Sequence, residues 1–227
     1  MSQKQWIAAA IVSLALSIPL SATPDKGDTE KRLQEAANTI DEIMSAPDKG
    51  IPADLFQKAA CVTIVPGVKK AAFVIGAKYG RGFMVCRNGK GGWTAPAGVR
   101  VEGGSVGFQI GGAETDVVML VMNQDGVNKL LSNKFTFGAD ASATAGPVGR
   151  SASAATDAQL KAEILTYSRS KGLFAGVSLE GATLRTDEDA NKDLYGKAVS
   201  NKDIVAGTVA PPASAAGLLS EVKKHAG

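Results

Sequence analysis

CVTIVPGVKKAAFVIGAKYGRGFMVCRNGK, residues 61–90, and its continuation GGWTAPAGVRVEGGSVGFQI, residues 91–110, decide the fold of this chain. Short apolar runs alternate here with glycine-containing turn signals, and Asn88-Gly89 is a strong hairpin signal. The pattern predicts consecutive short strands, the first of which ends at Pro66-Gly67. Glycine accounts for 26 of 227 residues without a fixed period, which excludes a collagen-like repeat and indicates tight turns and bulges.

Helical patterns flank this strand-rich region on both sides. Apolar residues at helical spacing predict a helix over residues 30–44, and Pro52 opens a second, shorter helix. Further helices are expected over residues 123–132, 187–195 and 201–206, and further strands over 117–122, 162–168 and 173–179. Strands in the middle with helices at the ends predict an α+β fold, an antiparallel sheet or partly closed β-barrel flanked by N- and C-terminal helices.

The domain organisation is read from composition. Residues 1–22 have the pattern of a secretory signal peptide, with Lys4, an uncharged apolar run over 6–18, Pro19 and a small pair at Ser21-Ala22. An uncleaved membrane anchor is the alternative. Residues 23–29 are expected as a polar linker, residues 30–206 as a single domain, and residues 207–227 as a mobile Ala/Pro-rich tail. This organisation predicts an exported protein of the periplasm or cell envelope.

Two cysteines, Cys61 and Cys86, both fall within predicted strands. In an oxidising compartment they could form a disulfide, and the alternative is a pair of separate, buried apolar residues. Two cysteines 25 residues apart without a nearby histidine make at most half of a zinc site, so no metal is expected there.

The basic residues of this region are its most informative chemical feature. Residues 61–110 hold seven Lys or Arg and a single acidic residue, Glu102, whereas the whole chain has a net charge of only +3. A local positive field attracts anionic, phosphate-bearing partners. The candidate lipid-binding residues, expected to form one positive surface at a sheet rim, are Lys69, Lys70, Lys78, Arg81 and Arg100. The alternative is that strand alternation sends them to opposite faces.

Residues for enzyme chemistry are few. His225 is the one histidine, near the end of the sequence. The run over 103–107 matches G-x-S-x-G around Ser105, but strand-forming residues follow it where a nucleophile elbow needs a helix, so we interpret it as a turn. Glu114 and Asp116 are interpreted as a solvated strand end. The sequence therefore predicts a protein that is not an enzyme and needs no cofactor, with an unrecognised hydrolase as a remote alternative.

Several short motifs occur in an order that identifies a family resemblance. They are VPGVKK (65–70), GRG (80–82), GGSVGFQIGG (103–112), TDVV (115–118), FTFGAD (135–140), AGPVGR (145–150), KGLFAGVSLEG (171–181) and NKDLYG (191–196). With these motifs the chain resembles the SYLF lipid-binding domain family over about residues 30–206. The resemblance implies a single domain that binds phosphoinositides or other anionic lipids.

The resemblance also implies a possible site that this sequence does not favour. Family members that bind membranes are described as using a basic, amphipathic N-terminal helix, but here residues 30–44 are rich in acidic residues and lack Trp and Phe. The expected partners are therefore anionic membrane lipids bound by the basic sheet, with peripheral membrane association. An envelope protein that binds protein partners is the alternative function. Nucleic acid is not an expected partner, because aromatic residues for base stacking make up only 5% of the chain.

Overall fold

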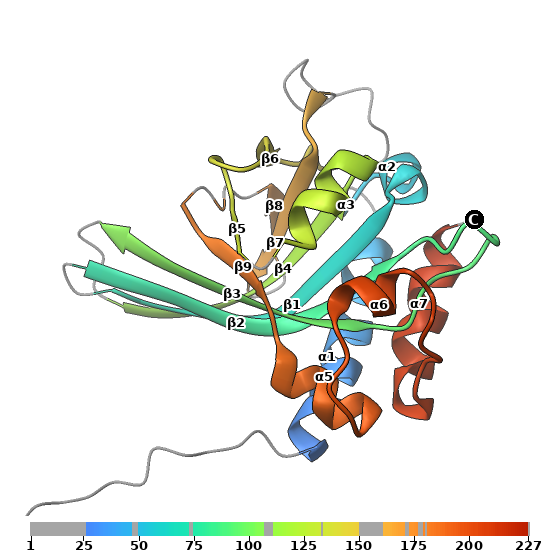
Figure 1. Ribbon diagram of the computed structural model, residues 1–227. Coiled ribbons are helices and arrows are strands. Elements are labelled where there is room, and N and C mark those ends of the chain that lie inside the picture. Colours follow the sequence, from blue (N-terminus) through green and yellow to red (C-terminus); the bar gives the residue numbers. More distant parts are fainter. Residues whose placement is uncertain are drawn as a thin grey trace, which may run out of the picture.

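The computed structural model describes residues 26–46, 50–72, 75–106, 111–132, 134–149, 161–170, 173–176, 179 and 181–226. It confirms the α+β fold, a curled, partly closed sheet packed against N- and C-terminal helices (Figure 1). The expected leader, residues 1–22, lies outside the described residues. The expected linker over 23–29 lies partly in the first helix, which begins at Lys26.

Nine strands form the sheet within the described residues, in the order β5-β9-β3-β2-β1-β4-β7-β6, with β8 paired to β7. The strands are β1 (Cys61–Ala72), β2 (Ile75–Cys86), β3 (Ala97–Val106), β4 (Gly111–Val121), β5 (Phe135–Thr136), β6 (Ala143–Ala145), β7 (Ile164–Ser170), β8 (Leu173–Gly176) and β9 (Thr183–Thr186). All pairs are antiparallel except β6 with β7. The ends of β1 to β4 extend beyond the helices (Figure 1).

The helices lie where local start signals place them. They are α1 (Lys26–Ser45), α2 (Ala53–Lys58), α3 (Gln124–Leu130), α5 (Glu188–Tyr195), α6 (Asn201–Val205), the short 3₁₀ turn η2 (Ala213–Ala215) and α7 (Ala216–Ala226). Side-chain oxygens of Asn123, Asp187 and Ser200 accept backbone N–H groups and so cap α3, α5 and α6. These caps explain why the helices begin within a residue of the expected positions.

A bulge in β1 replaces the strand end that the sequence predicted at Pro66-Gly67. The register of β1 shifts here against both of its neighbours, and Gly67 adopts a φ of 56°. The Gly67 N–H finds its partner outside the ladder, since it donates to Asp116 Oδ1 at 2.8 Å. As a result Val65 and Val68, three residues apart, lie in the same core cluster, and β1 continues to Ala72.

The curled sheet has an apolar core on each face. On one face, Val62, Phe83 and Leu120 pack with residues of α1, α2 and α7. On the other face, residues such as Met84 and Met119 pack with α3, β5 and α6. Because both faces of the central strands are covered, their sequences read as continuous apolar runs rather than as an alternating pattern.

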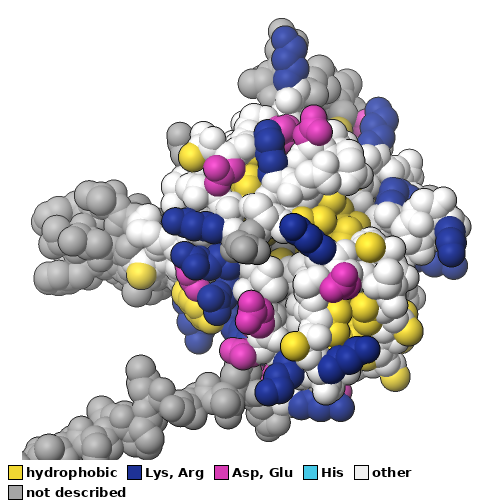
Figure 2. All heavy atoms as spheres, viewed as in Figure 1, with side chains coloured by type: hydrophobic (Ala, Val, Ile, Leu, Met, Phe, Trp, Pro, Cys, Tyr) yellow, Lys and Arg dark blue, Asp and Glu magenta, His cyan; other side chains and the backbone are white. Residues whose placement is uncertain are grey.

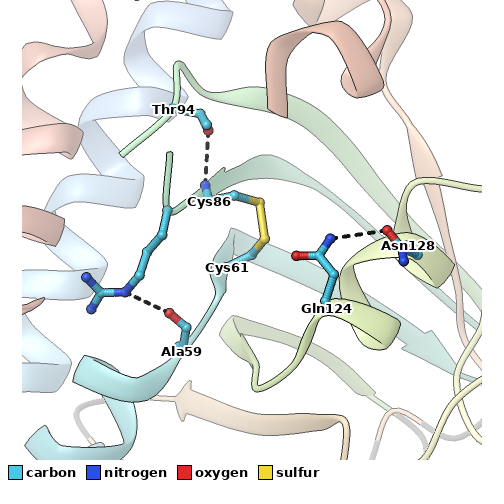
Figure 3. The surroundings of a disulfide bond; sticks show 7 residues. Ala59, Cys61, Cys86, Thr94, Gln124 and Asn128 are labelled. Carbon is cyan, nitrogen blue, oxygen red and sulfur yellow. Dashed lines mark hydrogen bonds between the residues drawn. A yellow bond between two sulfur atoms is a disulfide. The ribbon is translucent and has the colours of Figure 1, made fainter. Parts of the chain in front are cut away.

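Cys61 and Cys86 are direct register partners in β1 and β2, with their Cα atoms 4.0 Å apart. Their sulfur atoms form a disulfide at 2.03 Å, and both side chains are buried. Figure 3 shows the backbone N–H of Cys86 donating to the Thr94 hydroxyl beside this bond. The disulfide therefore joins the start of β1 to the end of β2 within the core.

The C-terminal segment, expected as a mobile tail, is instead part of the domain. Leu218, Val222 and Ala226 of α7 are at most 7% exposed and pack against α1 in the helix-side core. Arg87 adds a polar contact, since its Nη2 donates to the carbonyl of Ala226 at 3.4 Å. The Ala/Pro-rich composition of residues 206–216 belongs to the connection that leads to α7, a packed amphipathic helix.

Residues 103–106 of the glycine-rich run likewise belong to a strand and not to the turn that the sequence predicted, and Gly107 lies outside the described residues. Gly103, Gly104 and Ser105 belong to β3, where they are register partners of Lys78, Ala77 and Gly76. A Cβ at Gly103 would lie 3.1 Å from Cα of Ala182, so the close approach of the chain before β9 accounts for this glycine. Ser105 therefore lies within a strand and not on a strand–helix elbow.

Candidate functional site

The predicted basic residues occupy three adjacent strands but fall into separate groups. Arg81 on β2 is the register partner of Arg100 on β3, whereas Lys70 on β1 is the register partner of Lys78 on β2. Lys69 is paired with Tyr79 on one side and with Glu114 on the other. Because neighbouring residues of a strand face opposite sides of a sheet, the register divides the expected single surface between two faces.

A third arginine, which the sequence reading did not include, completes a row across the sheet. Arg185 on β9 is the register partner of Arg100, so Arg81, Arg100 and Arg185 lie side by side on β2, β3 and β9. We call these three residues the arginine row. Arg81 lies two residues before Phe83, whose side chain is in the helix-side core, so the row lies on the face that carries α1 and α5.

The first member of the arginine row is held by a buried ion pair. Arg81 Nη2 donates to Asp187 Oδ1 at 2.6 Å, its Nε donates to Oδ2, and the two side chains are only 13% and 1% exposed. These hydrogen bonds raise the pKa of Arg81. Asp187 also caps α5 by accepting the Ala190 N–H. Arg81 therefore holds α5 against the sheet through Asp187. This corrects the expectation that Arg81 lies on an open rim of the sheet.

Arg32 on α1 adds positive charge next to this ion pair. Burial lowers the pKa of its guanidinium, and the charge of Arg81 lowers it further. Its Nη1 atom is buried and makes no hydrogen bond to the described residues. The carboxylates of Asp187, Glu35 and Asp28 act in the opposite direction and raise the pKa of Arg32.

Arg100 and Arg185 are the accessible part of the arginine row. They are 36% and 40% exposed, and both approach one carboxylate, Glu102, at 3.0 Å and 3.4 Å from their Nε atoms. Neither Nε has a hydrogen-bond partner among the described residues, so the ion pairs leave two directed donors unsatisfied. Two guanidinium groups that share one acceptor provide more N–H donors than that acceptor can use.

These two arginines line a cavity of about 380 Å³ with Thr186, Glu188 and Asp189. The two acidic residues belong to the first turn of α5, where they complement the helix dipole. Arginine side chains are suited to bidentate contacts with phosphate or carboxylate groups. The cavity therefore presents two guanidinium groups, which share Glu102, beside the two carboxylates of Glu188 and Asp189.

The lysines lie farther along the long strands. Lys69 is exposed, Lys78 is half-buried, and Tyr79 beside them is 48% exposed. Figure 2 shows basic side chains gathered left of centre on this view of the molecule, with acidic side chains between them. The surface on this side is thus mixed in charge.

The other residues that the sequence offered for catalysis make ion pairs or packing contacts that support the fold. Asp116 binds Arg169 at 2.7 Å and the Gly67 N–H, and Arg169 also pairs with Glu42 of α1. His225 lies on α7 with its ring edge-on to Phe56, far along the chain from Ser105. Within the described residues, no helix is both long and apolar enough to cross a membrane.

Arg185 and Asp187 could have been found only in part from the sequence. The helix predicted over 187–195 begins with Asp187, and this position agrees with its role as the cap of α5. Arg185 lies in β9, a four-residue strand that the sequence reading did not predict. Alternation of Leu184 with Thr183 and Arg185 is a weak strand signal, and no local pattern reveals which strand it pairs with.

The sequence matches one protein family and several of its members. Residues 102–225 match the family model described as "Ysc84: Las17-binding protein actin regulator". The chain is 35% identical over 192 residues to LAS seventeen-binding protein 3 of Saccharomyces cerevisiae, covering 82% of this chain and 41% of that protein. It is 34% identical over 189 residues to SH3 domain-containing YSC84-like protein 1 of Homo sapiens, covering 82% and 55%.

A further yeast relative shows the same partial coverage. Protein YSC84 of Saccharomyces cerevisiae is 35% identical over 206 residues, which cover 88% of this chain and 44% of that protein. The chain therefore spans about half the length of the relatives that it matches. The family model matches more than half of the chain and includes Arg185 and the Asp187 cap. The chain belongs to the Ysc84, or SYLF, domain family.

Proposed function

We propose that this protein binds anionic phospholipid or phosphoinositide-like head groups at a membrane surface and catalyses no reaction. The observation that carries the proposal is the pair Arg100 and Arg185, which line a cavity of about 380 Å³ and whose Nε atoms have no hydrogen-bond partner among the described residues. A phosphate group offers several acceptor oxygens to such donors, whereas Glu102 offers only two. Binding consists of the exchange of Glu102 for a phosphate.

The lysines of β1 and β2 have a supporting role in this proposal. Lys69, Lys70 and Lys78 lie on the parts of the strands that extend beyond the helices, where the register divides them between the two faces of the sheet, so they add positive charge to these strand ends while the cavity holds one head group. Lysine acts as a mobile point charge, and several of them attract an anionic surface at long range. The half-exposed Tyr79 offers an aromatic contact at the lipid–water interface.

We also propose that the protein is exported and acts in the periplasm or cell envelope. The leader-like residues 1–22 support this location, and so does the Cys61–Cys86 disulfide, since such bonds persist in oxidising compartments. The family description names an actin regulator, and actin is not an expected partner in that location. The lipid-binding part of the family's role is the one that we assign.

Binding of a protein partner in the envelope is the second candidate function. It is favoured by a groove of about 440 Å³ between residues 88–95 and 206–211, which is lined by the half-exposed Trp93 and by Pro211. Partly exposed tryptophan is a common anchor of protein interfaces. The relatives' names, which describe binding to another protein, are consistent with this alternative.

Sedimentation with phospholipid vesicles tests the proposal. The purified protein should sediment with vesicles that contain phosphatidylserine or a phosphoinositide but not with pure phosphatidylcholine vesicles, and salt should weaken the binding. The R100A/R185A variant should bind at least tenfold more weakly. The matched control K197A/K223A removes the same charge from exposed positions and should bind like the unchanged protein. If both variants lost the same amount of vesicle binding, the interaction would depend only on net charge, and the proposed site would be refuted.

A further inference from the structure

Three metal-ligating side chains meet where the C-terminal helix crosses the N-terminal helix. Glu221 and His225 are four residues apart on α7 and therefore share one face, and Asp41 projects from α1 toward them. One ligand atom from each residue lies within 4.8 Å of the other two. This cluster is separate from the arginine row and belongs to neither of the functions proposed above.

A cation already occupies the space between the two carboxylates. Lys224 Nζ donates to Asp41 Oδ1 at 2.8 Å and to Glu221 Oε2 at 3.1 Å. The Lys224 side chain is 53% exposed, so its long, flexible stem can leave without disturbing the core. The two carboxylates are thus arranged to hold a positive charge, and an amino group provides it in this structure.

His225 provides a second, independent observation that points to a ligand between α1 and α7. His225 Nε2 is buried and has no hydrogen-bond partner among the described residues, yet it lies 3.8 Å from Glu221 Oε2. Its ring is set by the edge-on contact with Phe56, with centroids 6.5 Å apart. A buried nitrogen without a partner calls for an explanation, and two carboxylates with oxygen atoms within 4.8 Å of the ring nitrogen offer one.

We infer that Asp41, Glu221 and His225 form a binding site for a divalent transition metal of the zinc class. One imidazole nitrogen and two carboxylate oxygens are a donor set that such metals accept, with water in the remaining position. Donor atoms around a tetrahedral zinc ion lie roughly 3.4 Å apart when the bonds are about 2.1 Å, so small rotamer changes suffice. The metal takes the position of the Lys224 amino group and ties α1 to α7.

Calorimetric titration of the purified, EDTA-treated protein with ZnCl₂ tests this inference. The expected result is one site per chain. H225Q should weaken binding at least tenfold, and this variant is specific because the sequence has one histidine and both cysteines form the disulfide. K224M removes the competing amino group, so it should bind Zn²⁺ several-fold more tightly than the unchanged protein.

The controls separate a defined site from loose binding to surface carboxylates. E30Q removes an exposed carboxylate from the same helix, and it should leave the affinity for Zn²⁺ unchanged. Circular dichroism establishes whether each variant is folded. If H225Q does not fold, D41N provides a second variant that lacks one of the three ligands. Absence of Zn²⁺ binding by K224M, or equal binding by H225Q, D41N and the unchanged protein, would overturn the inference.

Discussion

Arg100 on β3 and Arg185 on β9 are register partners that approach the same carboxylate, Glu102, from neighbouring strands. Like charges directly opposite each other in a sheet repel, so the pair depends on an anion between them. In this structure the anion is Glu102, which comes from the same strand as Arg100. In the proposed function, a lipid phosphate takes the place of Glu102 between the two arginines.

The Arg81–Asp187 ion pair is expected to stabilise the domain. D187A leaves the nearly buried Arg81 without its counter-charge and removes the cap of α5, so we predict a loss of about 3 kcal/mol in the free energy of unfolding. D187N keeps a capping oxygen and should lose less. Urea denaturation followed by circular dichroism measures both.

Glu188 provides the matched control for this pair. It follows Asp187 in the first turn of α5 but is exposed, so E188A should change the free energy of unfolding by no more than about 0.5 kcal/mol. A D187A variant as stable as E188A would show that the ion pair does not hold α5 in place.

The disulfide is expected to contribute to stability chiefly by restricting the unfolded chain. Its cysteines are 25 residues apart, and a loop of this length corresponds to roughly 3–4 kcal/mol in the chain-entropy account. C61A/C86A should therefore unfold at lower urea concentration than the oxidised protein. Dithiothreitol should lower the urea midpoint of the oxidised protein and leave the midpoint of the C61A/C86A variant unchanged. If dithiothreitol does not change the urea midpoint of the oxidised protein, the disulfide does not stabilise the domain.

Helix α7 is expected to be a structural part of the domain. Leu218 is 1% exposed and lies in the helix-side core, so L218A should cost roughly 2–5 kcal/mol of unfolding free energy. K223A on the exposed side of the same helix should be nearly neutral. Thermal unfolding of the two variants measures the difference, and similar values for both would mean that α7 is not packed in solution.

Much of the fold could be predicted from local patterns. The helix over 30–44, the short helix after Pro52 and the strand over 117–122 correspond to α1, α2 and β4 because their apolar periodicity reflects the faces that they bury. Pro66-Gly67 was read as a strand end, although its turn-forming residues serve a bulge. Only the register against β2 and β4 distinguishes the two, and that register is a long-range property.

The candidate site could be predicted only in part, for the same reason. Composition showed that residues 61–110 are basic, and it brought Arg81 and Arg100 into consideration. It could not show that Asp187, more than 100 residues away, neutralises Arg81, or that Arg185 lies beside Arg100. Pairing between distant strands determines both facts, and no local signal encodes it.

The affinity of E102Q for anionic vesicles tests the central claim most directly. If Glu102 and a lipid phosphate compete for Arg100 and Arg185, E102Q should bind vesicles that contain phosphatidylserine several-fold more tightly than the unchanged protein. D125N, which removes one exposed negative charge from α3, is the control and should bind like the unchanged protein. Equal or weaker binding by E102Q, or the same gain in D125N, would contradict the account.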